Sequence, residues 1–244
     1  MRTAKNSTKH FAHISSIYYN LRSIAKKLQF KNASTEAIFT NIYHGNKWVG
    51  AQSVSGTGSD ASQTRTIIDQ LPKLFSEHKI KSILDIPCGD FLWMKELDLT
   101  GIEYIGGDIV QDLINENQTN YHSDSVRFQR LNLLTDELPS ANLVLCRDCL
   151  VHFSFDDIFK AIEAISNSGC EYFLTTTFAD RTVNHNITTG DWRPINLEIA
   201  PFHFPKPIRL INEECMENRA LYRDKSLGLW RIEELKDLNI HSNS

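Results

Sequence analysis

The chain has 244 residues, of which 41% are hydrophobic and 23% charged, values typical of a soluble globular protein with one sizeable core. No apolar run approaches the roughly 20 residues that a membrane-spanning helix needs, and no apolar signal segment stands near the start. The five cysteines are an odd number, which favours reduced thiols and a cytoplasmic location over a disulfide framework.

The charge is unevenly distributed along the chain. Residues 1–35 carry seven basic side chains and no acidic one, so of the net charge of −4 this segment contributes +7 and the remainder −11 (−4 minus 7). An acidic main body is a poor match for a polyanion, because nucleic-acid binding depends on neutralising phosphates. The sequence therefore argues against a nucleic-acid partner.

Residues 1–33 are predicted to form a basic amphipathic helix or extension. Apolar residues recur there at i, i+3, i+4 and i+7, which indicates one apolar stripe. Such a helix is expected to pack on the main domain or on a second copy of the chain in a homodimer; a membrane-surface helix and an organelle-targeting peptide are the alternatives. The stripe comprises Ile14, Ile17, Tyr18, Leu21, Ile24, Ala25 and Leu28.

Residues 34–80 are predicted to form a helical cap with a loop. Ser34 or Thr35 can cap a short first helix, and Asp60 can cap a second one that extends to about His78. Pro72 can bend that second helix or mark a break in it. The stretch between the two helices, "NKWVGAQSVSGTGSD", is rich in Gly and Ser and is typical of a loop.

Strand and helix patterns alternate from residue 81 onward, which predicts an α/β domain over residues 81–244 with a doubly wound, mostly parallel sheet. A Pro- and aromatic-rich insertion at residues 178–207 interrupts the alternation. The clearest helix covers Asp156–Ser166, and "KSLGLWRIEEL" predicts a final strand and a short helix. The earlier strands are expected at Ser82–Ile86, Glu103–Asp108, Val126–Leu131, Leu143–Cys146 and Tyr172–Thr176.

Open α/β sheets bind ligands at the carboxyl ends of their strands, so the residues that follow each strand are the candidates for a site. The first strand runs into "DIPCGDF", where Gly89 lets backbone N–H groups approach a ligand. The dinucleotide pattern G-x-G-x-x-G is absent, because Pro87 and Phe91 stand where glycines would. A nucleoside without a pyrophosphate is therefore favoured over the cofactor of a dehydrogenase.

Later strand ends add further polar groups. Asp108, about 20 residues after the Gly89 turn, can accept hydrogen bonds from both ribose hydroxyls, or it can cap a helix. Asn132 can hydrogen-bond an adenine edge or form a turn. Arg147 and Asp148 follow the fourth strand.

The ordered segments "LDIPCGDF", "YIGGDI", "LNLL" and "NLVLCRDCLVHFS" resemble those of the class I S-adenosylmethionine-dependent methyltransferases. The resemblance extends from about Phe39 onward and implies a Rossmann-like sheet of about seven strands with an N-terminal helical cap. It implies S-adenosylmethionine as the cofactor and S-adenosylhomocysteine as the product. The segments "GDWRPINLEIAPFHFP" and "LGLW" resemble a subgroup associated with small-molecule or glycan methylation.

The same resemblance implies roles for individual residues. Asp85 and Gly89 would line the methionine portion of the cofactor, and Asp108 would bind its ribose. Asn132 would contact the adenine, where relatives usually have Asp. Cys146 and Asp148 would border the sulfonium and amino-acid end. The cofactor site is expected to comprise Asp85, Pro87, Cys88, Gly89, Asp108, Ile109, Asn132, Leu133, Cys146 and Arg147.

Methyl transfer to a hydroxyl requires a group that removes the proton. His152, four residues after Asp148, is the candidate general base because the pKa of histidine lies near neutrality. Asp148 is expected to orient His152 or to hold the cofactor's amino group. A half-buried His152 that packs against the following helix, or caps it, is the alternative.

The insertion at residues 178–207 falls where an acceptor site needs walls. Its polar and aromatic side chains suit a small polar acceptor, and Arg193 could pair with an acidic group; a loop that packs these side chains over the sheet is the alternative. The candidates are Asp191, Trp192, Arg193, Asn196 and Phe202.

The sequence thus predicts methylation of a hydroxyl on a small molecule or glycan, a sugar or sugar-derived compound being favoured. N-methylation of a small amine and non-catalytic binding of S-adenosylmethionine by a scaffold protein are the alternatives. Cys146 and Cys149 have C-x-x-C spacing, but no second ligand pair accompanies them, so no metal is expected.

Overall fold

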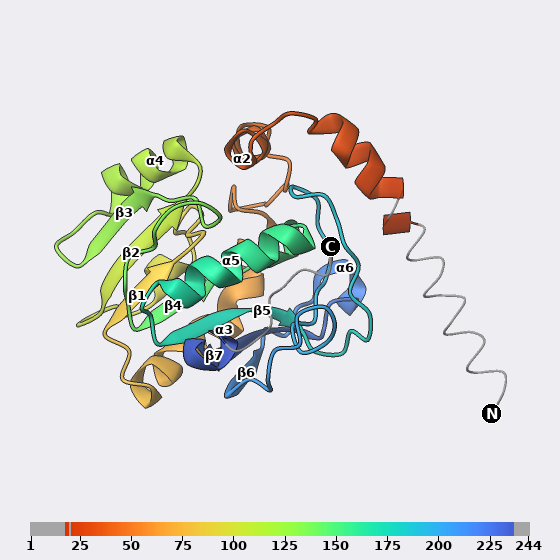
Figure 1. The fold of residues 1–244 in the computed structure, drawn as a ribbon. Coiled ribbons are helices and arrows are strands. Elements are labelled where there is room, and N and C mark those ends of the chain that lie inside the picture. The colour runs from red at the N-terminus through yellow and green to blue at the C-terminus, as the bar shows by residue number, and fades with distance from the viewer. Residues whose placement is uncertain (1–17, 20, 237–244) are drawn as a thin grey trace, which may run out of the picture.

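A seven-stranded sheet with the order β3-β2-β1-β4-β5-β7-β6 forms the centre of the computed structural model, which describes residues 18, 19 and 21–236 (Figure 1). Strands β1 to β5 pair in parallel, whereas β7 lies antiparallel between β5 and β6. The predicted doubly wound, mostly parallel sheet is confirmed. The strands are β1 (Ser82–Asp85), β2 (Glu103–Asp108), β3 (Val126–Arg130), β4 (Leu143–Cys146), β5 (Tyr172–Phe178), β6 (Arg209–Asn212) and β7 (Lys225–Arg231).

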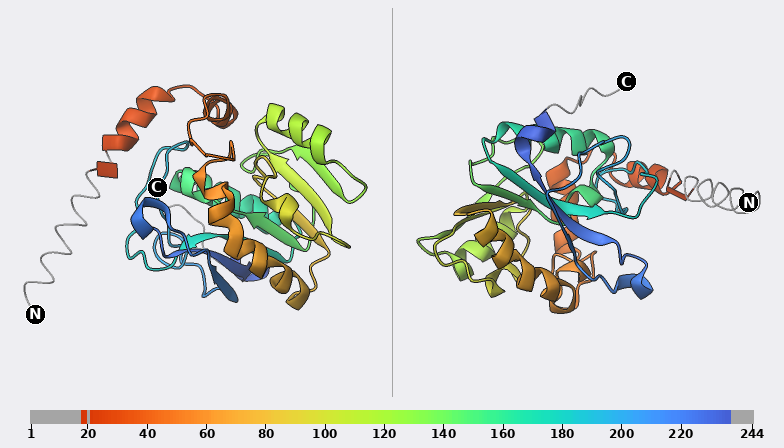
Figure 2. Two further views of the ribbon diagram at one scale, coloured as in Figure 1. Left: turned by 180° about the vertical axis from the view of Figure 1, so that it is seen from behind. Right: turned by 90° about the horizontal axis from the view of Figure 1, so that it is seen from below.

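Helices cover both faces of the sheet, as the views from the front and from behind show (Figures 1 and 2). Helix α3 (Ala61–Glu77) packs its apolar side on one face, and helices α5 (Phe155–Asn167) and α7 (Ile232–Lys236) pack on the other. Helix α4 (Gln111–Tyr121) lies beside β2 and β3. Because both faces are covered, every residue of the inner strands β4 and β5 is buried, as parallel sheets require.

The cap helices follow their sequence signals. Helix α2 (Thr35–His44) begins after Ser34, whose Oγ accepts a hydrogen bond from the Ala37 N–H at 3.1 Å. Helix α3 begins after Asp60, but the Asp60 carboxylate accepts from the N–H groups of residues 51–53 and so holds the loop between the helices. Pro72 lies on the exposed side of α3, which continues through it without a break.

The insertion at residues 178–207 runs from the end of β5 without forming a helix or strand. Residues 21–29 are helical and contact this insertion through polar groups: Arg22 pairs with Asp191 at 2.6 Å, and the hydroxyls of Ser23 and Thr188 lie 2.9 Å apart. The apolar stripe points the other way, since Leu28 is 72% exposed. Ile14 and Ile17 of that stripe lie outside the described residues.

The sequence did not predict strand β6. Only Ile211 of its four residues is buried, so this edge strand lacks the apolar pattern that marks the inner strands. In the described part of the chain, no helix is long and apolar enough to cross a membrane.

Candidate functional site

A pocket lies over the carboxyl ends of β1, β2 and β4, beneath α2 and the loop of residues 45–60. We call it the strand-end pocket. Three acidic side chains from three different strand ends line it, namely Asp85, Asp108 and Asp148, together with Asp90 in the turn after β1. Aromatic side chains from α2 and the loop, Phe39 and Trp48, form its opposite wall. The pocket therefore combines a floor rich in carboxylates with an apolar cover.

The turn after β1 brings its backbone close to the 45–60 loop. Gly89 has a φ of +55°, and a Cβ atom there would lie 2.3 Å from Oγ of Ser55, so only glycine fits. The Ser55 Oγ accepts a hydrogen bond from the Asp90 N–H at 3.0 Å. Pro87, Cys88 and Gly89, which the sequence predicts to contact the cofactor, all line the pocket.

Phe91, which stands where a motif glycine would, points away from the pocket. Its ring packs among Tyr104, Tyr121 and Phe128, with ring-centre distances of 5.0, 5.2 and 5.1 Å. The residue is buried and has a φ of +58°, a conformation that costs a bulky side chain on the order of 1 kcal/mol. The aromatic packing offsets that strain, and the strand-end pocket stays open beneath the turn.

Asp85 and Asp108 are buried carboxylates held in different ways. The Tyr104 hydroxyl donates to Oδ2 of Asp85 at 2.6 Å, but burial still raises the pKa of Asp85 to about 7. Asp108 accepts one backbone N–H on each oxygen, from Val110 at 3.0 Å and from Gly89 at 3.3 Å, and burial raises its pKa to about 6. Since a carboxylate has about four lone-pair sites, Asp108 keeps acceptor capacity toward the pocket.

Asn132 lies at the far end of the pocket, where Ile109 and Leu133 also line the wall. Its Oδ1 accepts from the Leu134 N–H at 3.0 Å, which is the turn-forming contact that the sequence allowed. The amide oxygen keeps one lone pair, and no hydrogen bond among the described residues uses the Nδ2 donor, so Asn132 can offer a donor to a ligand.

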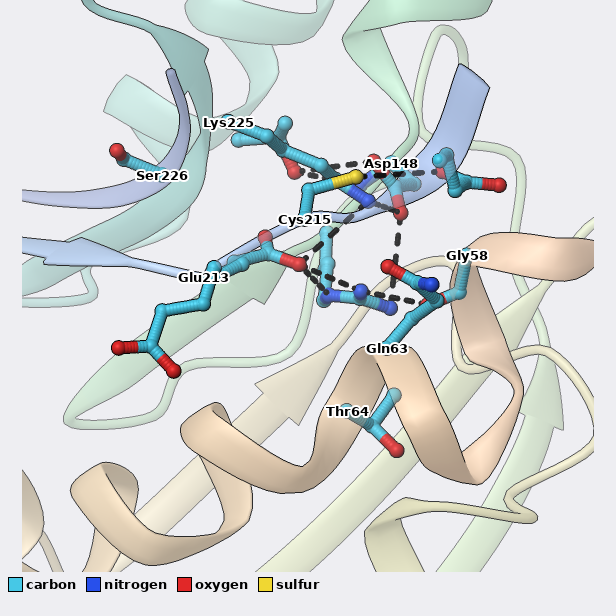
Figure 3. A network of polar contacts seen from close by, with 12 residues as sticks. Gly58, Gln63, Thr64, Asp148, Glu213, Cys215, Lys225 and Ser226 are labelled. Atoms are coloured by element: carbon cyan, nitrogen blue, oxygen red, sulfur yellow. Dashed lines mark hydrogen bonds and ion pairs between the residues drawn. The ribbon is translucent and has the colours of Figure 1, made fainter. Parts of the chain in front are cut away.

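Asp148 is half-buried and belongs to a cluster of four charges whose other members, Arg147, Glu213 and Lys225, are buried (Figure 3). Lys225 of β7 places Nζ 2.6 Å from Oδ2 of Asp148, and Arg147 places Nη2 2.6 Å from Oε2 of Glu213. Although burial alone would raise it, the charges of Lys225 and Arg147 hold the pKa of Asp148 at about 2. Asp148 is therefore ionised at neutral pH and cannot serve as a base there.

His152 ends the short 3₁₀ helix η3 (Leu150–His152) and lines the strand-end pocket. Its Nδ1 lies 2.8 Å from the backbone oxygen of Asp191, so Nδ1 carries the proton and Nε2 keeps its lone pair. Burial lowers the pKa of His152 to about 4, which keeps the ring neutral at pH 7. The backbone carbonyl of Asp191 orients the imidazole ring. Among the described residues, the Asp148 side chain forms hydrogen bonds with Thr176 and Lys225 and makes no hydrogen bond to His152.

A second cavity adjoins the strand-end pocket, and we call it the side cavity. Trp48, Ser55, Asp148 and His152 line both spaces, so these residues form their shared boundary. The side cavity is further lined by Gly56, Thr57, Gly58, Phe178, Trp192, Glu217, Tyr222 and Lys225. A molecule in the side cavity would thus meet one in the strand-end pocket at Asp148 and His152.

Most of the insertion residues expected at an acceptor site hold the insertion together instead. Arg193 is fully buried and donates to the backbone oxygens of Leu150 and Phe153, both at 2.8 Å. Asn196 donates to backbone oxygens of the insertion itself, and Phe202 packs on α5. Neither they nor Asp191 line the two spaces; of the five candidates, Trp192 does.

Cys146 also lies outside both linings, fully buried at the end of β4, whereas its neighbour Arg147 reaches the strand-end pocket. The sequence did not predict four residues that line the side cavity, namely Trp48, Glu217, Tyr222 and Lys225. Lys225 could have been suspected, because a lysine at the start of an apolar strand pattern needs a charged partner when buried. Within the described ranges, no group of three or more His, Cys, Asp or Glu side chains could hold a metal ion.

The sequence matches no protein-family model, and no curated protein sequence matches it either. Solved structures match the fold. Human N-acetylserotonin methyltransferase, crystallised with S-adenosylmethionine, has a TM-score of 0.58 at 15% identity over 84% of this chain, and this chain covers 61% of that longer one. Magnesium protoporphyrin IX methyltransferase from Synechocystis PCC 6803, also with bound S-adenosylmethionine, has a TM-score of 0.54 at 13% identity, covering 82% of this chain and 99% of that one.

A third similar structure is the methyltransferase domain of bacterial CtHen1, with a TM-score of 0.52 at 8% identity over 69% of this chain and 99% of that one. All three have low sequence identity, so what they share with this chain is the arrangement of the backbone. In this chain the backbone forms a sheet with the order β3-β2-β1-β4-β5-β7-β6 and an antiparallel β7. The chain therefore has the fold of the class I S-adenosylmethionine-dependent methyltransferases.

Proposed function

We propose that this protein is an S-adenosylmethionine-dependent methyltransferase that methylates a hydroxyl of a small polar acceptor, a sugar or sugar-derived compound. The observation that carries the proposal is the pair of adjoining spaces with Asp148 and His152 at their shared boundary. A transferase needs such an arrangement, because donor and acceptor must meet with water excluded, and positioning alone can contribute several kcal/mol.

The strand-end pocket fits S-adenosylmethionine better than a dinucleotide. Its floor of carboxylates suits a ligand with a cationic sulfonium and an ammonium group, and would repel a pyrophosphate. Gly89 lines the pocket, and the Phe91 ring packs among other aromatic side chains and leaves the pocket unfilled. When bound, S-adenosylmethionine would supply an electrophilic methyl group.

Individual residues would then hold the parts of the cofactor. Asp108 would accept hydrogen bonds from the ribose hydroxyls with its remaining lone pairs, which would also favour its ionised form. Asn132 would donate from Nδ2 to the adenine, between Ile109 and Leu133. Asp85 and the Gly89 turn would lie along the methionine portion.

His152 would act as the general base. Its ring is neutral at pH 7, and the proton on Nδ1 is fixed by the Asp191 carbonyl, so Nε2 is the atom that can accept a proton from the acceptor hydroxyl. The ionised Asp148 nearby would stabilise the imidazolium that forms. Asp148 would contribute by its charge, and we assign it no proton transfer.

The acidic body of the protein supports a small-molecule or glycan acceptor over a nucleic acid. A cytoplasmic location and a homodimer stay predictions of the sequence.

Calorimetric titration with S-adenosylhomocysteine tests the proposal. Micromolar or tighter binding is expected, and Asp108→Ala should weaken it at least about tenfold, since a hydrogen bond to a charged group contributes about 1.5–3 kcal/mol. Asp69→Ala, which removes an exposed carboxylate on α3, is the matched control and should bind like the wild type. Absence of binding by the folded wild-type protein would reduce the conclusion to one about fold.

A further inference from the structure

The walls of the side cavity are aromatic. Trp192 and Tyr222 lie 4.9 Å apart between ring centres, and Phe178 lies about 6 Å from each, at 6.1 and 6.0 Å. Trp48 forms the wall toward His152, with 4.9 Å between the two ring centres. Trp48, Trp192 and Tyr222 are half-buried, so parts of their rings face the cavity. Aromatic faces carry partial negative charge and attract cations.

The charges around the side cavity do not cancel. The four-charge cluster is neutral as a set, because Arg147 and Lys225 balance Asp148 and Glu213 (Figure 3). Arg181, which stacks behind Phe178 and Tyr222, is balanced by Asp224 at 2.7 Å. These pairings leave one further carboxylate in the lining, that of Glu217.

Glu217 has neutral partners only. Its Oε1 accepts a hydrogen bond from the Thr57 hydroxyl, and its Oε2 lies 3.6 Å from Sγ of Cys215. Within residues 18–236 as described, no Lys or Arg forms an ion pair with it. The side cavity therefore carries one negative charge that its own side chains leave uncompensated.

We propose that the side cavity selects an acceptor that carries a cationic ammonium group in addition to its hydroxyl, such as an amino sugar or an amino alcohol. The inference deepens the proposed function and rests on it. The ammonium group would lie against the faces of the aromatic rings, and Glu217 would supply the opposing charge. The hydroxyl of the same molecule would then lie toward His152 and the boundary with the strand-end pocket. A neutral molecule of the same shape would make neither the cation–π contact nor the ionic contact with Glu217, and would bind more weakly.

A pair of isosteric probes tests the proposal. Choline and 3,3-dimethylbutanol have the same shape and a hydroxyl each, but only choline is charged. Their binding is measured by tryptophan fluorescence and calorimetry on protein saturated with S-adenosylhomocysteine, so that the strand-end pocket is occupied. Choline is expected to bind at least about tenfold more tightly than the neutral probe. Glu217→Gln should remove most of that preference and leave the neutral probe unaffected.

Glu214→Gln is the matched control, because it makes the same change at an exposed neighbouring residue that lines neither space, and it should keep the preference. Equal affinity for the two probes, or no binding of choline, would overturn the ammonium proposal while leaving the cofactor site intact. Failure of S-adenosylhomocysteine to bind at the saturation step would instead contradict the proposed function, so the two failures are separable.

Discussion

Lys225 on β7 and Asp148 after β4 come from segments far apart in the sequence, yet Nζ of the lysine lies 2.6 Å from Oδ2 of the aspartate. Nζ of the same lysine lies 3.5 Å from Oε2 of Glu213. The lysine side chain is 5% exposed, so its charge is stable there only because the two carboxylates face it. The antiparallel strand β7 thus supplies the charge that keeps Asp148 ionised at the edge of the site.

Removing Lys225 should destabilise the protein, because Asp148 and Glu213 depend on its positive charge. Lys225→Met leaves two acidic side chains facing Arg147 alone, and we expect the free energy of unfolding to fall by about 3–5 kcal/mol in urea titrations. The double variant Lys225→Met/Asp148→Asn removes both partners and should be less destabilised than the sum of the two single variants. If the losses of unfolding free energy in this double-mutant cycle were additive, the two residues would not interact.

Arg193 should contribute more to stability than its neighbour Trp192. Arg193→Met removes the donors to the Leu150 and Phe153 carbonyls, so that the Phe153 carbonyl loses its guanidinium partner and the Leu150 carbonyl keeps only the Phe153 N–H. We expect a loss on the order of 3 kcal/mol in the free energy of unfolding. Trp192→Leu, at the neighbouring position in the cavity wall, should cost less than half as much. Similar losses for the two variants would contradict these assignments.

The contribution of Asp85 to the stability of the protein should fall as the pH rises from about 4 to 8. His152, whose pKa is lowered to about 4 in the folded protein, contributes with the opposite sign between about pH 4 and 6.5, so the Asp85 contribution is measured against a variant of Asp85. Burial raises the pKa of Asp85 to about 7 in the folded protein, above its ordinary value of 3.8, so the folded state binds more protons in this range. The stabilisation is complete below pH 4 and is lost as the pH passes the folded pKa. Asp148, with a pKa of about 2, does not titrate here.

Asp85→Asn provides the check, since an amide oxygen can still accept from the Tyr104 hydroxyl. Relative to the wild type, the variant should gain about 1–3 kcal/mol in unfolding free energy between pH 5 and pH 8. A difference that stays constant with pH would show that Asp85 titrates as an exposed carboxylate does.

The rate of methyl transfer should show no loss from protonation of His152 until the pH falls below about 5, because the pKa of this ring is about 4. The rate of methyl transfer is measured as the release of S-adenosylhomocysteine in the presence of a panel of amino alcohols and sugars as acceptors. His152→Gln should lower kcat by about 10²–10⁴-fold and leave S-adenosylhomocysteine affinity unchanged. A variant with wild-type turnover would exclude His152 as the base and favour an amine acceptor that needs none.

The fold could be predicted from the sequence because its inner strands are buried on both faces and appear as continuous apolar runs, as in β4 and β5. The residues at the strand ends, such as Asp85 and Asp108, could be predicted because parallel strands bring their carboxyl ends together. Strand β6 could not, since three of its four residues are exposed.

The side cavity was harder to predict because its walls come from four distant segments. Nothing near Trp48 in the sequence indicates that it meets Tyr222 and Trp192. Arg193 was assigned to the acceptor site because a guanidinium in an insertion near the strand ends could pair with an acidic group. In the structure, the carbonyls around η3 need donors, and the Arg193 guanidinium supplies them.

The link between Arg147 and the 45–60 loop has a kinetic consequence. Nη2 of this buried guanidinium donates to the Gly58 carbonyl at 2.7 Å, and the loop forms part of the roof of the strand-end pocket. Lifting the roof would break that bond, at a cost on the order of 1–3 kcal/mol. A cofactor that left by this route would dissociate more slowly than from a Gly58 loop without this hydrogen bond.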